Sequence, residues 1–278
     1  MGDYYSCDVY ACALRATTNI EKSLAKCKKW AFGARFFVTK FSKKRGDFVS
    51  FCTFVLRVSS RSHAMIQVPF FGQADLHSAD SLRAIADTLT PHSVACCNWP
   101  DAFPYAPETE LRLFHTGSHL VLDYTVREAC TAARVSEDLG EVWTDSCCEF
   151  FLQPRGEGNY YNIEATCIGR VLIGWRPGRE GAVHAQKDLL DKVLRYPSLG
   201  SEPFEERCGD NRWRLTLAVP AEALFADKIA SFSGLEARFN CYKCGDNLSR
   251  PHYISLAPIA TPAPDFHRPE YFIPIRFE

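Results

Sequence analysis

The sequence predicts an all-β protein, an antiparallel β-sandwich or jelly roll with a few short helices. Beyond Pro107 the chain divides into short segments of alternating or apolar residues, separated by residues typical of turns. Many short strands of this kind indicate a sandwich or a barrel. The hydrophobic content of 46% and the charged content of 23% are ordinary for a globular protein. We see no internal repeat and no low-complexity tract.

The strand prediction is clearest where a turn signal separates two strand-like segments. Residues 111–115 and 119–126 flank Thr116-Gly117-Ser118 and predict a hairpin. Gly156, Gly158 and Gly169 mark further turns. The remaining predicted strands are residues 147–153, 160–167, 171–175, 213–219, 235–242 and 271–277.

Helices are predicted to be few and short. In residues 80–89, Leu82, Ile85 and Leu89 lie near helical spacing, and Pro91 ends the pattern. Residues 187–194 predict a second short helix, and residues 220–225 one or two helical turns. Three prolines hold residues 98–107 in an irregular, extended conformation.

The charge divides the chain into two parts. Residues 1–64 carry 12 Lys and Arg against 4 Asp and Glu, whereas the rest carries 20 against 29. Residues 1–64 also show no sustained apolar period, and Met65 is the only methionine after Met1. We therefore expect residues 1–64 to be a basic extension, disordered or not native, and residues 65–278 to form the sandwich from a natural start at Met65. The alternative is a basic arm that binds nucleic acid or an anionic membrane. The intact mass of the native protein distinguishes these readings.

The cysteines indicate a reducing compartment. Thirteen is an odd number, and the spacing lacks the regularity of a secreted disulfide framework. The chain has no apolar run long enough to span a membrane and no signal-peptide pattern. We expect mostly free buried thiols in a cytoplasmic, monomeric protein without a membrane or nucleic-acid partner.

The residues around Trp143 carry the functional prediction. Glu149 lies in an apolar strand, on the same face as Cys147 and Phe151, because side chains alternate along a strand. A charged group seldom stays in such a strand without a partner. An aromatic ring near a carboxylate suits a sugar, since the ring covers C–H groups while the carboxylate accepts from hydroxyls. A core tryptophan near a salt-bridged glutamate explains the same pattern.

Three other residue groups have weaker functional interpretations. Cys241 and Cys244, with His252 and His267, invite a zinc site, but cysteines three apart in a strand point to opposite faces, so we expect no metal there. Glu149 and Glu164 could form an acid/base pair for glycoside cleavage if their carboxyls lie roughly 5–10 Å apart. The segment 265–270, which contains His267 and Arg268, is a salt-bridged loop or the rim of a site.

Several segments taken together resemble the family 9 carbohydrate-binding modules and their single-domain relatives common in gut-type Bacteroidetes. The segments are residues 142–152, 160–169, 237–246 with 251–255, and 264–272. They match in order and spacing from about residue 100 to the C-terminus. The similarity does not reach residues 1–64.

The resemblance implies an antiparallel sandwich that holds a mono- or oligosaccharide between two tryptophans. It makes Trp143 one wall, Glu149 a ligand-contacting carboxylate and Glu164 a polar neighbour on the sheet. The second wall is expected near Ser255, where this chain has Leu256 instead. Trp175 or Tyr253 could supply that ring. Some members of the family carry structural calcium, whose ligands we do not assign in this chain.

Non-catalytic, lectin-like carbohydrate binding, as in bacterial polysaccharide catabolism, is therefore the leading functional prediction. The predicted site contains Trp143, Glu149, Glu164, Trp175, Tyr253, His267 and Arg268, with no catalytic residue and no cofactor. Two other classes stay open. A glycoside hydrolase would use the two glutamates, and a protein-interaction sandwich would present an exposed apolar patch.

Overall fold

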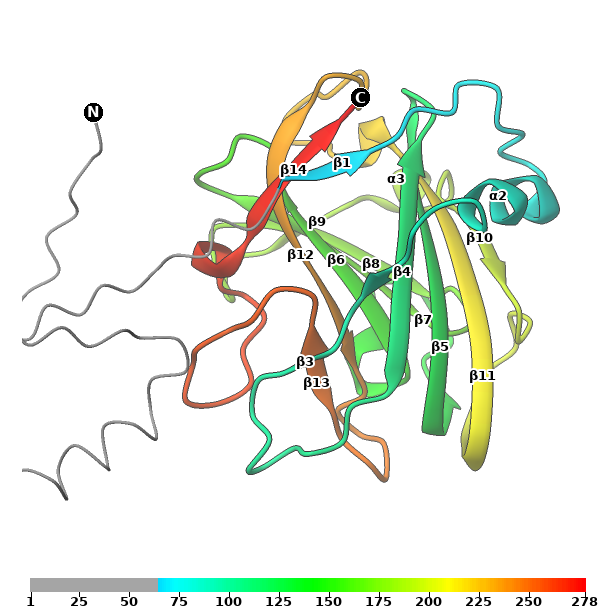
Figure 1. Cartoon of the computed structure of the whole chain (residues 1–278), viewed down its shortest axis with the longest axis vertical. Coiled ribbons are helices and arrows are strands. Elements are labelled where there is room, and N and C mark those ends of the chain that lie inside the picture. The colour runs from blue at the N-terminus through cyan, green and yellow to red at the C-terminus, as the bar shows by residue number, and fades with distance from the viewer. Residues whose placement is uncertain (1–64) are drawn as a thin grey trace, which may run out of the picture. The chain divides into compact units, whose positions relative to one another are not determined.

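A computed structural model describes residues 65–278, which form two β-sheets packed face to face with few helices (Figure 1). The predicted mostly-β sandwich is therefore confirmed. Residues 1–64 lie outside the described residues, and so do the two interpretations of that segment, a basic extension and a basic binding arm. No helix in residues 65–278 has the length and apolar character needed to cross a membrane.

The larger sheet holds most of the strands identified from the sequence. In spatial order its main path is β1 (Ile66–Val68), β14 (Ile273–Phe277), β12 (Glu236–Cys244), β6 (Cys147–Gln153), β7 (Tyr160–Thr166), β8 (Val171–Arg176) and β9 (Val183–His184). β13 (Tyr253–Ser255) pairs with β12 and with β3 (Cys96–Cys97). All these pairs are antiparallel except β1 with β14.

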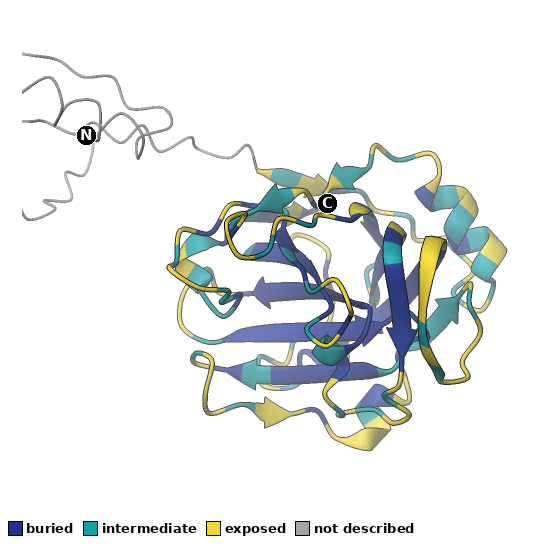
Figure 2. Ribbon diagram, turned by 90° about the horizontal axis from the view of Figure 1, so that it is seen from below, coloured by how far each residue is buried: buried dark blue, intermediate teal, exposed yellow. Residues whose placement is uncertain are grey.

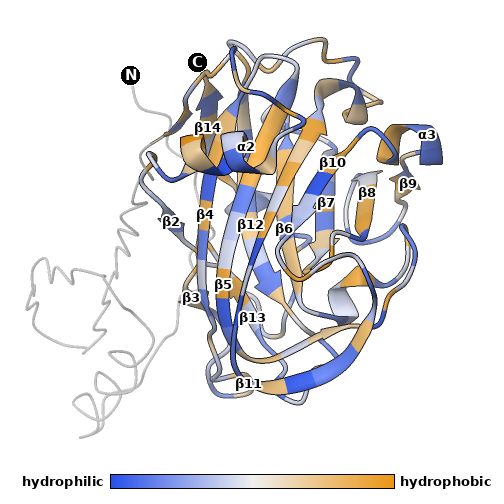
Figure 3. Cartoon of the chain, turned by 90° about the vertical axis from the view of Figure 1, so that its right-hand side faces the viewer, coloured by the Kyte–Doolittle hydropathy of each residue, from blue (hydrophilic) through white to orange (hydrophobic). Residues whose placement is uncertain are grey.

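The smaller sheet is built on two long strands. Its order is β10 (Leu194–Pro197), β11 (Phe204–Pro220), β5 (His119–Ala133), β4 (Glu108–His115) and β2 (His92–Ser93). The predicted hairpin is confirmed, since β4 and β5 pair from His115 opposite Leu120 across Gly117, which has a positive φ of 86°. The first half of β11 is largely exposed and hydrophilic (Figure 3), and it pairs with β5 through register shifts.

The helical elements are as short as the sequence predicts. α2 (Ala79–Ala86) begins at Ser78, whose side chain accepts from the amide of Ser81. α3 (Lys187–Leu190) is a single turn. The 3₁₀ turns are η1 (Val142–Thr144), η2 (Ala221–Ala223) and η3 (Pro269–Tyr271).

Both faces of the larger sheet are buried, as the dark strands in Figure 2 show. Its inner face, which carries Phe150, Ile163 and Phe239, packs against the smaller sheet in the main core. The opposite face, called here the outer face, carries Phe151 and Tyr242. Residues of the 98–107 and 256–272 segments, Trp99 and Phe266 among them, cover part of this outer face. Alternation along β6 therefore sorts its side chains as predicted, but loops conceal the outer set from water.

The inner face also contains a charged cluster. The Nζ of Lys243 lies 2.8 Å from Oε2 of Glu128 and 2.8 Å from Nε2 of His252, and all three side chains are fully buried. Trp213 donates from its indole nitrogen to Glu128 at 2.7 Å. Burial alone would raise the pKa of Glu128, but the charges of Lys243 and His252 and the hydrogen bonds to Glu128 together outweigh burial and hold that pKa below its ordinary value. The buried carboxylate is thus paired with a buried cation.

The cysteines among residues 65–278 comprise one disulfide and seven free thiols. Cys130 of β5 and Cys208 of β11 are register partners and form the disulfide. The expectation of mostly free thiols holds for this part of the chain, with that one exception. The adjacent cysteines at 96–97 and 147–148 are all free.

Candidate functional site

Two glutamates lie opposite each other on the outer face of the larger sheet. Glu149 of β6 and Glu164 of β7 are register partners, so both side chains leave the same face of neighbouring strands. They are only 3% and 4% exposed. Alternation predicts this face for Glu149, and the register adds Glu164 directly beside it.

The environment of the two glutamates favours their neutral forms. Burial raises the pKa of Glu164 to about 7. Burial, together with the charge of Glu164, raises the pKa of Glu149 well above its ordinary value. A protonated carboxyl can donate as well as accept a hydrogen bond. The pair can therefore offer both kinds of partner to a neutral, hydroxyl-bearing ligand near neutral pH.

The immediate hydrogen bonds leave part of the pair unpaired. The thiol of Cys244 donates to Oε1 of Glu149 at 3.0 Å. The side-chain amide of Asn162 donates to Oε1 of Glu164 at 2.6 Å. Oε2 of Glu164 and Oδ1 of Asn162 are buried without a hydrogen-bond partner among the described residues. Such orphaned polar atoms are rare in folded proteins and indicate a place for water or a ligand.

An arginine on the neighbouring strand adds positive charge to this face. Arg176 of β8 is 8% exposed and donates to the carbonyl of Arg179 at 2.9 Å, while its Nε has no partner in the described chain. Its charge acts to lower the pKa of Glu164. Gly174, opposite Asn162, keeps the space open, since a Cβ there would lie 2.6 Å from Oδ1 of Asn162.

Sequence reasoning missed Asn162, Arg176 and Cys244 as members of this face. Asn162 and Glu164 are two apart in a strand, a spacing that places side chains on one face. That signal was available for Asn162. The positions of Arg176 and Cys244 depend on strand pairing, which alternation alone does not specify.

Trp143 belongs to the same side of the sheet as the two glutamates. It lies in η1, two residues before the buried Asp145, and its half-buried ring packs against the outer-face cluster that contains Phe151 and Tyr242. Its carbonyl accepts from the amide of Asp246 at 3.1 Å and from the thiol of Cys244 at 3.6 Å. Cys244 thus contacts both the backbone of Trp143 and the carboxyl of Glu149.

Tyr253 lies beside these residues on β13. It is half-buried, is the register partner of Cys244 and makes an edge contact with Phe103, with ring centroids 4.7 Å apart. Asp246 is near it, and burial raises the pKa of that aspartate to about 6. Tyr253 is therefore an aromatic side chain on the same side as Trp143.

His267 and Arg268 lie at one edge of the outer face. Nδ1 of His267 is 3.0 Å from the hydroxyl of Tyr160, and burial lowers the pKa of His267 to about 3. Arg268 instead forms a surface pair with Glu270, with Nε 2.8 Å from Oε1. His267 thus packs with the buried aromatic residues of the outer face. Arg268 belongs to a salt-bridged loop, which was one of the two interpretations of residues 265–270.

Trp175 and Leu256 are not brought to the outer face. Trp175 of β8 alternates with Arg176, so its ring packs against the main core between the sheets. Leu256 also packs against that core. Ser255 is buried and donates to the carbonyl of Ala257 at 2.6 Å. Of the side chains considered for the second aromatic wall, Tyr253 is therefore the one that lies on the same side of the sheet as Trp143.

Two side-chain clusters in residues 65–278 have the spacing of metal ligands. One is Cys147, Glu149 and Cys244, and the other contains the disulfide cysteines with Glu206. Cys241 packs in the main core and Cys244 on the outer face, which supports the sequence argument against a metal knuckle between them. Calcium prefers oxygen ligands, so neither cysteine-containing cluster suits the calcium ion that the resemblance left open.

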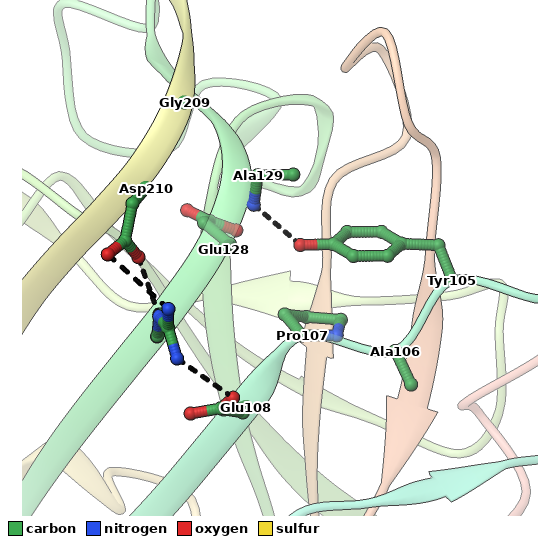
Figure 4. A pocket seen from close by; sticks show the side chains of 9 residues that line it. Tyr105, Ala106, Pro107, Glu108, Glu128, Ala129, Gly209 and Asp210 are labelled. Atoms are coloured by element: carbon green, nitrogen blue, oxygen red, sulfur yellow. Dashed lines mark hydrogen bonds and ion pairs between the residues drawn. The ribbon is translucent and has the colours of Figure 1, made fainter.

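A cavity of about 300 Å³ lies away from this face, at the end of β5 (Figure 4). Tyr105 lines this cavity, and its hydroxyl accepts a hydrogen bond from the amide of Ala129 at 2.6 Å. Arg127 pairs with Asp210 at 2.6 Å and with Glu108 at 3.3 Å. Charged side chains that line the cavity are thus paired with one another, and none of the predicted site residues lines the cavity.

Comparison with known proteins identifies the family. A family model described as "Carbohydrate-binding family 9" matches residues 82–277. A solved structure from Bacteroides uniformis ATCC 8492, described as a candidate carbohydrate-binding protein, is 37% identical, with a TM-score of 0.74 over 77% of this chain and 99% of that chain.

Two more distant structures are family 9 modules from Caldicellulosiruptor kristjanssonii, one in complex with glucose and one with cellotriose. Both are 10% identical with a TM-score of 0.46 and cover 77% of this chain and, respectively, 95% and 93% of theirs. No curated protein matches the chain. The family match spans most of the chain and agrees with the 37% identical relative. The chain therefore belongs to carbohydrate-binding family 9.

Proposed function

We propose that the chain binds a carbohydrate without cleaving it, at the outer face of the larger sheet beside Trp143. The observation that carries this proposal is the set of buried polar atoms without partners on this face. These atoms are Oε2 of Glu164, Oδ1 of Asn162 and Nε of Arg176. Sugar hydroxyls both donate and accept, so one pyranose could satisfy several of them at once.

Each part of the site has a separate physical role in the proposal. The indole of Trp143 covers the C–H face of the sugar, which removes apolar surface from water at roughly 25 cal/mol per Å². Glu149 and Glu164 hydrogen-bond the hydroxyls, and hydrogen bonds between neutral groups contribute about 0.5–1.5 kcal/mol each. With a single tryptophan wall, and after the entropy of association, we expect dissociation constants of micromolar to millimolar order.

The test is calorimetric titration of the full chain with glucose, cellobiose and xylobiose. Trp143→Ala should weaken binding of the preferred sugar at least tenfold, since it removes the stacking surface. Glu149→Gln, which keeps the shape of the side chain, should weaken it by a similar factor.

Phe70→Ala is the matched control for loss of an aromatic ring. Phe70 is exposed and contacts His115 of the smaller sheet, with ring centroids 5.3 Å apart. This variant should bind sugar as the wild type does. Equal binding by wild type and Trp143→Ala would remove Trp143 from the site.

A hydrolase is the rival with a specific observation in its favour, since the two glutamates are register partners. A retaining or inverting mechanism needs one of its two carboxyls ionised. At neutral pH this condition is met, because Glu164, whose pKa burial raises to about 7, is partly ionised, while the pKa of Glu149 lies well above its ordinary value. The match to a carbohydrate-binding family nevertheless leads us to expect no reducing-sugar release from cello- or xylo-oligosaccharides. Release that disappears in Glu149→Gln would favour the hydrolase instead.

A further inference from the structure

Two buried thiols face each other across β6 and β12, next to one of the site glutamates. Cys147 and Cys244 are register partners on the outer face, and both are almost fully buried. Glu149 follows two residues after Cys147 on the same face. The two sulfur atoms and a carboxylate oxygen of Glu149 all lie within 4.8 Å of one another.

These three groups have only weak hydrogen-bonding partners. The carboxyl of Glu149 accepts from the Cys244 thiol at 3.0 Å, and a thiol is a weak donor. The site therefore brings together two thiols and a carboxyl, all potential anionic ligands, and none of them forms an ion pair with a cation among the described residues. A metal ion would stabilise their anionic forms directly.

We propose that Cys147, Cys244 and Glu149 bind a zinc ion. Thiolate and carboxylate ligands together suit zinc, with Zn–S distances of about 2.3 Å and Zn–O distances of about 2.0–2.2 Å. In a tetrahedral site these lengths put neighbouring ligand atoms roughly 3.5–3.8 Å apart. In the structure, Sγ of Cys244 lies 3.0 Å from Oε1 of Glu149, and all three ligand atoms lie within 4.8 Å of one another. The separations expected around zinc fall between these two values.

Three protein ligands leave a fourth position for water. Structural zinc sites are usually closed by four protein ligands, whereas an open position is typical of sites that meet a small molecule. Glu164 lies opposite Glu149, and its Oε2 has no partner among the described residues. That oxygen can accept from a zinc-bound water, as outer-shell carboxylates do in other metal sites.

The charge and proton balance is simple. Zinc binding replaces two S–H protons and the Glu149 proton, which pass to solvent, and nothing is oxidised or reduced. Two thiolates and one carboxylate leave a net charge of −1 on the loaded cluster. The positive charge of Arg176, which acts on both glutamates, offsets this remainder.

This inference goes beyond carbohydrate binding and does not rest on it. The two proposals share Glu149 and Glu164, but Trp143 belongs only to the sugar site and the thiols only to the zinc site. Zinc is measured without sugar, so failure of either proposal can be recognised separately. Trp143→Ala should retain zinc even where it loses sugar.

The experiment loads the full chain, kept reduced with a phosphine, with zinc or with cobalt(II) as a spectroscopic substitute. Wild type should retain one more equivalent of zinc after gel filtration than Cys147→Ser or Cys244→Ser, as measured by elemental mass spectrometry. It should also show a sulfur-to-cobalt charge-transfer band that both variants lose. Glu149→Gln should keep the thiols but bind zinc at least tenfold more weakly.

Cys97→Ser is the control, because Cys97 is a free, partly exposed thiol of β3 outside the cluster. It should behave as the wild type does. A second measurement needs no variant: zinc should slow alkylation of Cys147 and Cys244 in urea below the unfolding transition. Equal zinc content in wild type and both serine variants, or equal alkylation with and without zinc, would overturn the proposal.

Discussion

Two groups of buried ionisable side chains lie against opposite faces of the larger sheet, and they differ in whether the carboxyl is paired with a cation. On the inner face, Lys243 and Glu128 neutralise each other within 2.8 Å. On the outer face, Glu149 and Glu164 face each other without an equivalent cation in direct contact. A buried ion pair serves structure, whereas buried carboxyls without a paired cation mark a place for a ligand. The contrast is the reason for locating function on the outer face.

The inner cluster predicts a large stability effect from a single residue. Lys243→Met should lower the free energy of unfolding by about 3–5 kcal/mol, because it leaves Glu128 buried without its cation. Lys243→Met combined with Glu128→Gln should lose less than the single variant, since the remaining group is neutral. Urea unfolding measures both. A loss below about 1 kcal/mol for the single variant would contradict the prediction.

His267 predicts part of the acid sensitivity of the fold. An unfolded histidine takes up a proton near pH 6.5, but His267 in the folded chain does so only near pH 3. The folded state therefore binds fewer protons between these values, and stability falls as the pH falls from 6.5 toward 3. His267→Gln should lose less stability than the wild type between pH 6.5 and 4 in urea unfolding. A stability difference between the two proteins that is the same at pH 6.5 and at pH 4 would contradict the prediction.

At the residue scale, the alternation of side chains along a strand predicted part of the candidate site. The rest depends on the register between neighbouring strands. The face of Glu149 follows from the strand pattern alone, and its neighbour Glu164 follows once the β6–β7 register is known. Trp175 and Arg176 are adjacent in β8, so their side chains point to opposite faces of the sheet. Trp175 packs against the main core, and Arg176 lies at the candidate site. Sequence patterns without a register cannot choose the face that a ligand meets.

At the element scale, the central strands were predictable because each contains several apolar or aromatic residues and most are bounded by turn signals. β6 was predicted over its full length, and β7, β8 and β12 to within two residues at either end. The short strands β2, β3 and β10 were not predicted, since two to four residues carry no measurable period. The first half of β11 was missed because its exposed polar residues show no apolar alternation.

The pairing of β5 with β11 leads to a prediction about the disulfide. Cys130 and Cys208 are separated by 78 residues, and the bond restricts the unfolded chain over that length. Replacing both by Ala should lower the free energy of unfolding by about 2–4 kcal/mol. Chemical denaturation measures this loss, with Cys97→Ala as a control for removal of a thiol. Equal stability with and without the pair would show that the link contributes nothing.

At the scale of the whole molecule, the sandwich is expected to fold without residues 1–64. Its main core contains residues from Val68 to Phe277, and the family match begins at residue 82. A chain that begins at Met65 should unfold in one cooperative transition and bind sugar as tightly as the full chain. Thermal unfolding and calorimetry check both points. A broad transition, or sugar affinity lost on shortening, would assign the first 64 residues a role.

The parallel pair of β1 and β14 has a mechanical consequence. Ile66 lies opposite Ile275 and Val68 opposite Phe277, so the first and last strands of the sandwich run side by side in one direction. Tension applied at Met65 and at Glu278 would slide these strands past each other lengthwise. Their hydrogen bonds would then share the load together instead of opening one by one, and the sandwich would resist stretching from its own ends.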